Sequence, residues 1–314
     1  MMKRKGFILS LFLFILLLVP QAALATEIGQ SFYFPGATLI FASGIAPHPG
    51  YVLVDQMLYY SGTVGKAVVG GKVRFDMEAE AWFNYLGLFY AFEEPVLGGR
   101  LQIGAAAPVA WLDVDAKAEG PLDTRTLSDS DSGRFGDAML TAALYWKGKG
   151  NFHYKLSESV FIPTGNFTAG NLANVGRNYW AFDTVFTATW VDLASGWEVS
   201  VAPGIMFNLE NPDTDYQSGT EFHVDFAMNK FLTKEHDLAV GFAGYYYKQL
   251  SGDSGEGAKL GDFKGEAYGI GPALLWSPKV DKGHLSLILK WIHDLDCTNR
   301  MEGDYGQLIV AYMF

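Results

Sequence analysis

Apolar and polar residues alternate along most of this chain, and after residue 25 there is no run of 18 apolar residues. In residues 179–190 the even positions are mainly aromatic or apolar, while the odd ones include Asp183, Thr187 and Thr189. A period of two indicates strands with one apolar face, and the lack of a long apolar run excludes a membrane-spanning helix. Such a chain folds either as a soluble β-sandwich or as a closed barrel that crosses a membrane.

Segment length and tryptophan placement favour the barrel. Trp180 and Trp190 share a face ten residues apart, which in a tilted strand separates them by roughly 25 Å, the height of the apolar band of a membrane barrel. The segments also run to ten or more residues, whereas strands of soluble sheets average about five or six. We predict an all-β, antiparallel, up-and-down transmembrane barrel of about twelve strands, with a membrane girdle that includes Trp180, Trp190, Trp197, Trp276 and Trp291.

The predicted strands cover most of residues 51–314, which form the barrel domain. Short polar connections alternate with longer loops rich in Gly, Asp, Asn and Ser, as expected when one end carries tight turns and the other carries extracellular loops. The expected strands are 51–61, 72–83, 100–112, 137–146, 152–162, 179–190, 197–207, 221–231, 238–248, 266–276, 284–294 and 305–314.

The first residues of the chain resemble an export signal, and the last residues resemble a signal for membrane insertion. Lys3, Arg4 and Lys5 precede an apolar run that ends before a small-residue site at Ala25, so residues 1–25 are predicted to be a secretory signal peptide cleaved near Ala25. At the other end, alternation reaches Tyr312 and Phe314, which we interpret as the signal for the machinery that inserts barrels. The expected location is the outer membrane of a Gram-negative bacterium, in contact with its lipid.

Residues 26–50 show no clean alternation and contain several Pro and Gly residues. We predict that this segment folds into the barrel lumen as a plug. Its aromatic surface would suit the passage of apolar molecules and is formed by Phe32, Tyr33, Phe34 and Phe41.

Charged residues recur on the face that we predict to line the lumen. They could select a permeant, or they could fill a rigid lumen with ion pairs, and the sequence leaves both readings open. These residues are Arg74, Asp76, Glu78, Glu80, Lys155, Asp183, Glu198, His223, Asp225 and Lys290. Glu158 contradicts the pattern, because it falls on the lipid-facing side of its strand. Either this strand contains a bulge, or its register differs from the predicted one.

Several other functions are excluded or disfavoured by the sequence. A net charge of −11 argues against nucleic-acid binding, and the single cysteine, Cys297, allows no internal disulfide. Residues 129–133 are acidic but lack a complete calcium-binding loop, so neither a metal nor a cofactor is expected. His284 and Ser286 resemble a catalytic pair, but the alternation turns both inward. We therefore predict no enzyme, and mutation of Ser286 tests the less favoured lipid hydrolase.

Several motifs resemble those of a known family. They are Pro35-Gly36, Pro47-x-Pro49-Gly50-Tyr51, Asn178-Tyr179-Trp180, Gly196-Trp197-Glu198, Asn211-Pro212-Asp213-Thr214-Asp215-Tyr216, Ser218-Gly219-x-Glu221-Phe222-His223, Gly252-Asp253-Ser254-Gly255 and Gly261-Asp262-Phe263-Lys264-Gly265. Together they resemble the family named for the MetA pathway of phenol degradation, which is related to SphA-type transporters. The resemblance implies an outer-membrane barrel associated with the uptake of aromatic or other hydrophobic compounds, and it implies no enzyme.

The expected function is therefore passive uptake of small hydrophobic or aromatic solutes through an outer-membrane channel. The alternative is a structural or adhesive barrel with a closed lumen.

Overall fold

The computed structural model describes residues 31–37, 39, 41–69, 72–119, 124–258 and 264–314, and its regular structure is all β. None of these residues forms a helix that is long and apolar enough to cross a membrane. The predicted signal peptide and the cleavage site near Ala25 lie outside the described residues.

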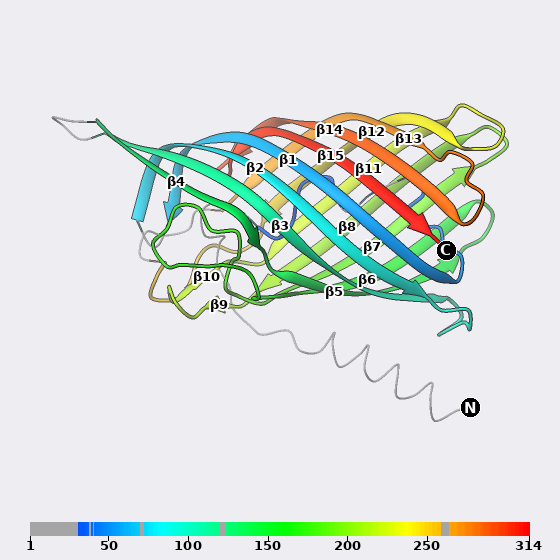
Figure 1. Cartoon of the computed structure of the whole chain (residues 1–314), viewed down its shortest axis with the longest axis horizontal. Coiled ribbons are helices and arrows are strands. Elements are labelled where there is room, and N and C mark those ends of the chain that lie inside the picture. The colour runs from blue at the N-terminus through cyan, green and yellow to red at the C-terminus, as the bar shows by residue number, and fades with distance from the viewer. Residues whose placement is uncertain (1–30, 38, 40, 70–71, 120–123, 259–263) are drawn as a thin grey trace, which may run out of the picture.

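The described chain contains a series of strands whose order follows the sequence (Figure 1). They are β1 (Gly50–Val69), β2 (Lys72–Ala91), β3 (Arg100–Glu119), β4 (Thr124–Phe135), β5 (Ala138–Lys147), β6 (Phe152–Ile162), β7 (Ala181–Asp192), β8 (Trp197–Asn208), β9 (Glu210–Asn211), β10 (Tyr216–Gln217), β11 (Glu221–Phe231), β12 (Leu238–Gln249), β13 (Glu266–Trp276), β14 (His284–Thr298) and β15 (Glu302–Met313).

Twelve of these strands close into an antiparallel barrel, which confirms the predicted fold and strand number. The last strand pairs with the first, so that Leu53 lies opposite Tyr312, and β2 pairs with both β1 and β3. Residues 100–106 of β3 pair with β5, and residues 109–119 of the same strand pair with β4. Strand β4 therefore extends the wall beside β3 without adding a place in the ring, and β9 and β10 form a separate small hairpin.

One sector of the wall is much taller than the rest. Strands β1, β2 and β3 each have 20 residues, about 66 Å at 3.3 Å per residue, whereas β7 has 12 residues. These strands and β4 project beyond their neighbours at the end opposite the C-terminus (Figure 1). The strands expected at 51–61, 72–83 and 100–112 are thus longer than predicted, because hydrogen bonding continues past the apolar band.

The outer surface of the barrel is apolar and rich in aromatic residues. All five predicted girdle tryptophans lie on outward faces, and Trp180, Trp197, Trp276 and Trp291 are 39–50% exposed. At the C-terminus, the rings of Tyr312 and Phe314 pack edge to face with centroids 5.2 Å apart. This surface suits a hydrocarbon environment, because its outward side chains are mainly apolar and the backbone polar groups are paired between neighbouring strands. The girdle and assembly roles of these residues stay predictions.

Strand β2 presents the opposite face from the one expected. Its acidic residues are exposed on the outside, in line with Trp82, and its small apolar residues are buried on the inside. The physical reason is that the inner surface here packs against an apolar cluster, and the acidic residues lie in the tall part of the strand. The inward orientation predicted for Asp76, Glu78 and Glu80 is therefore wrong. The side chain of Arg74 lies outside the described part of the chain.

Glu158 does lie on the outer face, as the alternation indicates. Its strand pairs in regular register with both β5 and β7, so neither a bulge nor a register error accounts for it. The hydroxyl of Thr184 on β7 donates to the Glu158 carboxylate at 2.5 Å. A neighbouring polar side chain thus partly compensates the removal of the carboxylate from water.

Candidate functional site

The N-terminal segment lies inside the barrel, where its aromatic residues contact several strands. The Phe32 ring stacks on Phe161 of β6 with centroids 4.5 Å apart. The next residue, Tyr33, stacks on the His223 imidazole of β11 at 4.1 Å. Phe34 packs edge to face against Phe83 of β2 at 4.9 Å. Three consecutive residues therefore contact three different parts of the wall.

The inward faces of β7, β8 and β11 form a surface that we call the polar wall. It contains Asp183, Glu198, His223 and Asp225, all buried. His223 Nε2 lies 3.0 Å from Asp183 Oδ1, and Asn229 Nδ2 donates to Glu198 at 2.5 Å. These partners satisfy charges that would otherwise be costly to bury.

The polar wall also binds the N-terminal segment. The Tyr33 hydroxyl donates to Asp225, and the Ser31 hydroxyl donates to Glu221. Gly204 on β8 makes room for this arrangement, because a Cβ at this position would lie 2.3 Å from Cε1 of His223. The His223 ring can therefore lie flat between the wall and Tyr33.

Two lysines predicted to line the lumen also face inward. The Lys290 ammonium on β14 donates to the carbonyl oxygens of Gly36 at 2.6 Å and Leu39 at 2.7 Å. Lys155 lies on the inward face of β6, opposite Thr187 of β7. Six of the ten predicted lumen residues thus share the interior with the N-terminal segment: Lys155, Asp183, Glu198, His223, Asp225 and Lys290. A role for them in contact with a permeant stays a prediction.

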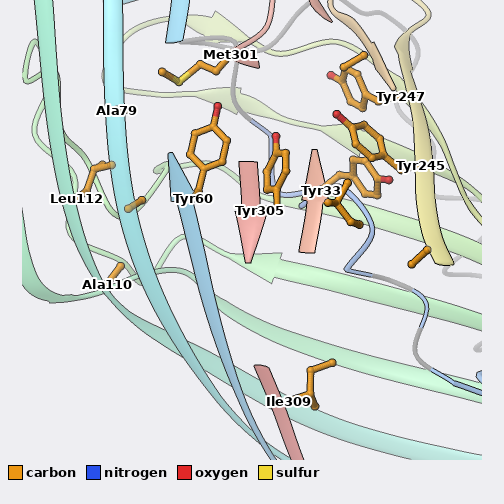
Figure 2. Close-up of a cluster of buried hydrophobic side chains, with 14 of the residues drawn as sticks. Tyr33, Tyr60, Ala79, Ala110, Leu112, Tyr245, Tyr247, Met301, Tyr305 and Ile309 are labelled. Carbon is orange, nitrogen blue, oxygen red and sulfur yellow. The ribbon is translucent and has the colours of Figure 1, made fainter. Parts of the chain in front are cut away.

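The inward faces of β1, β2 and β3 form a contrasting surface, the apolar wall. Met77, Ala79, Ala81 and Leu112 are at most 4% exposed there. Tyr60 on β1 lies beside Tyr305 on β15, with ring centroids 4.7 Å apart. Figure 2 shows this pair between the apolar wall and the group formed by Tyr33, Tyr245 and Tyr247.

A pocket of about 430 Å³, measured out to the solvent at its mouth, lies between the apolar wall and the N-terminal segment. Five aromatic side chains line it: Tyr33, Phe34, Tyr60, Phe83 and Tyr305. Its mainly aromatic lining is typical of sites that bind small molecules. The pocket is our candidate functional site.

Two arginines also line the pocket. Arg300, in the loop between β14 and β15, is only 6% exposed. Its guanidinium lies 4.0 Å from the centroid of Tyr247, and its Nη2 donates to the Tyr33 carbonyl oxygen at 3.2 Å. Arg177, in the loop before β7, lies over the Phe32 ring at 5.4 Å.

Of the predicted plug residues, Tyr33 and Phe34 line the pocket. Phe41 belongs to the buried cluster that includes the apolar wall, and the partly buried Phe32 packs against that cluster. Sequence reasoning missed Tyr60, Phe83, Tyr305 and both arginines, because none occurs in a motif. These residues lie far apart in the sequence and come together only when the barrel closes.

The residues considered for catalysis and metal binding have other contacts. Ser286 Oγ lies 3.1 Å from Ser277 Oγ, while the His284 ring stacks on His48 at 5.7 Å. Both residues lie on the face of β14 that points inward, as the sequence indicated, and His284 is exposed at the end of the strand. No hydrogen bond joins these two described residues.

Two acidic residues, one on β4 and one just before β5, stabilise the loop between β6 and β7. Asp129 accepts hydrogen bonds from the backbone N–H groups of Leu172 and Ala173. Asp137 accepts from those of Gly165 and Arg177. Burial raises the pKa of the Asp137 carboxyl, although these donors oppose the shift. Within the described chain, no group of three or more His, Cys, Asp or Glu side chains has the arrangement of a metal site.

Among solved structures, the chain is similar to an outer-membrane channel from Pseudomonas putida F1, at 16% identity and a TM-score of 0.65, over 88% of this chain and 100% of that one. It is also similar to the translocator domain of the autotransporter NalP from Neisseria meningitidis, at 9% identity and a TM-score of 0.46, over 85% of this chain and 90% of that one. A FadL homologue from Pseudomonas aeruginosa matches at 8% identity and a TM-score of 0.39, over 93% of this chain and 97% of that one.

The first of these similarities shows a shared barrel fold. No curated protein matches the sequence. A family model described as "Putative MetA-pathway of phenol degradation" matches residues 61–308, most of the barrel. The chain therefore belongs to this family, as the motifs in its sequence indicated.

Proposed function

We propose that this protein is an outer-membrane channel through which small aromatic or other hydrophobic compounds enter by passive diffusion. The observation that carries the proposal is the aromatic pocket inside a closed, lipid-facing barrel. A site of this kind offers an apolar molecule a favourable environment at an intermediate point of its path, and a pocket open at its mouth allows release.

Two further findings support the proposal. The family is described by a pathway of phenol degradation, and the similar Pseudomonas putida protein is described as an outer-membrane channel. The proposal also places the mature chain in the outer membrane after cleavage near Ala25. There the Trp residues of the outer face contact lipid, and Tyr312 and Phe314 present the signal to the insertion machinery.

The pocket can be tested by filling it without disturbing the outer face. We expect Ala81→Trp, whose side chain enters the pocket, to abolish most of the channel-dependent uptake of radiolabelled naphthalene by intact cells. Ala107→Trp is the matched control, because Ala107 is exposed on the outer face of β3, and it should leave uptake unchanged. Correct folding of each variant is checked by heat-modifiable migration in gels. Equal uptake by cells with and without the wild-type chain would refute the proposal.

A second candidate function is a structural or adhesive barrel with a closed lumen. The observation that favours it is the N-terminal segment, which occupies the interior. Its Tyr33 bonds to the barrel wall, and its Gly36 and Leu39 carbonyl oxygens accept hydrogen bonds from Lys290. Single-channel conductance separates the two functions. A conducting wild-type channel whose conductance rises when residues 31–45 are deleted supports a plug in a transport path. Unchanged conductance and solute flux after the deletion would contradict a plug.

A hydrolase is not supported by the arrangement of His284 and Ser286. We expect Ser286→Ala to take up solute as the wild type does. The variant and the wild type should also release the same amount of fatty acid from phospholipid vesicles.

A further inference from the structure

The lining of the pocket is positively charged within an acidic protein. The whole chain has a net charge of −11, yet the pocket lining includes two arginines and neither Asp nor Glu. An apolar pocket that admitted only neutral molecules would need no cation. The two arginines therefore indicate that the pocket recognises more than a neutral apolar molecule.

Arg300 is the stronger of the two anchors because its guanidinium is buried without a direct ion pair to a carboxylate among the described residues. No carboxylate lies within 4.0 Å of its guanidinium in the described residues, and its Nη1 has no hydrogen-bond partner there. The Tyr247 ring, the Tyr33 carbonyl oxygen and the nearby Tyr305 hydroxyl compensate part of the lost hydration. A buried, incompletely satisfied guanidinium is costly, and an anion that reached it would remove much of that cost.

The acidic residues near Arg300 have other partners. Glu221 interacts with Arg300 electrostatically, but its carboxylate accepts hydrogen bonds from Ser31 and Asn208. Asp294 also feels the Arg300 charge, but it accepts from the Tyr245 hydroxyl and the Gly303 backbone N–H. Arg300 thus retains the capacity to bind a ligand.

From this geometry we propose that the pocket binds aromatic carboxylates, with the ring among Phe34, Phe83 and Tyr305 and the carboxylate directed to the Arg300 guanidinium. This inference rests on the proposed uptake of aromatic compounds and names the class of compound. A carboxylate matches the planar fork of an arginine. A simple phenol stays neutral at pH 7, because its ordinary pKa is near 10, and therefore gains less from the buried cation.

The test is calorimetric titration of the purified, full-length channel in detergent. Benzoate is compared with benzyl alcohol, a neutral ring of similar size, and with hexanoate, an aliphatic carboxylate. We expect benzoate to bind about tenfold or more tightly than either compound, because it alone uses both the rings and the charge. Added salt should weaken the binding of benzoate and leave that of benzyl alcohol nearly unchanged.

Variants then locate the charge. Arg300→Gln should weaken benzoate binding about tenfold or more and leave benzyl alcohol unaffected, while Arg300→Lys should retain part of the preference. The matched control is Arg134→Gln, because Arg134 lies on β4 outside the pocket, with a side chain that is 58% exposed. It should bind both compounds as the wild type does. The comparison of ligands and salt on the wild-type protein stands even where Arg300→Gln does not fold.

The outcomes separate this inference from the proposed function. Equal affinity for benzoate and benzyl alcohol, or full benzoate binding by a folded Arg300→Gln protein, would overturn the role of Arg300. Hexanoate binding as tight as that of benzoate would overturn the preference for a ring. Binding of neither aromatic compound, together with no channel-dependent naphthalene uptake, would overturn the proposed function itself.

Discussion

The polar and apolar walls face each other across one lumen but hold the N-terminal segment by different interactions. The polar wall binds Tyr33 through the Asp225 carboxylate and the His223 ring. The apolar wall contacts Phe34 through the aromatic side chains of β2. Hydrogen bonds fix direction and position, whereas apolar contacts are not directional. The pocket lies against the apolar wall, where contacts of the second kind predominate.

The comparison also shows what alternation does not reveal. Along β11, acidic residues and His223 face inward and apolar residues face lipid, as in a water-filled barrel. Along residues 76–82 of β2 the two faces are exchanged: Ala79 is buried inside the barrel, and Glu80 is exposed on the outside. Alternation therefore identifies the residues that share a face, while the packing partner decides which way the face points.

The largest expected effect comes from placing a charge on the apolar wall. Ala79→Asp buries a carboxylate without a partner, and we expect it to lower the free energy of unfolding by about 3 kcal/mol or more. The measurement is urea unfolding in lipid vesicles, followed by tryptophan fluorescence. Its control is the adjacent Glu80→Ala, which should change stability by less than about 0.5 kcal/mol. The reverse result would place the acidic face of β2 inside the barrel.

A smaller effect is expected at the polar wall. Tyr33→Phe removes the hydroxyl that donates to Asp225, and the loss of a hydrogen bond to a charged group lowers stability by about 1.5–3 kcal/mol. Because the same bond holds the N-terminal segment, single-channel current should also become noisier. Tyr268→Phe is the control, since Tyr268 is 42% exposed on the outer face. Equal behaviour of the two variants would show that the bond to Asp225 does not hold the segment.

The smallest effect concerns the outside of the barrel. Glu158→Leu removes a carboxylate from the lipid-facing surface, and we expect it to raise stability in vesicles by about 1 kcal/mol, since an acidic group in the apolar band is unfavourable. Combining it with Thr184→Val removes the hydroxyl left without its acceptor and should retain or increase the gain. Destabilisation by both the single and the double substitution would indicate that Glu158 faces a polar environment.

Much of the barrel could be predicted because its constraint is local and repetitive. A strand between lipid and lumen must alternate along its own length, so the sequence alone indicates strands, their approximate ends and the outward Trp residues. The same logic identified the inward groups on β7, β8 and β11, and the aromatic N-terminal segment. It failed in β2, where apolar residues on the inner face pack against other protein elements rather than lipid.

By itself, the sequence determined the all-β class, the approximate number of strands and the family, because alternation and motifs are properties of short stretches of chain. Only the tertiary structure decided that the inner surface has a polar and an apolar wall, and that Arg300 lies beside rings from β1, β2 and β15. The physical reason is that the pocket has no sequence periodicity of its own. Its residues come together only when hydrogen bonds between the first and last strands close the barrel around the N-terminal segment.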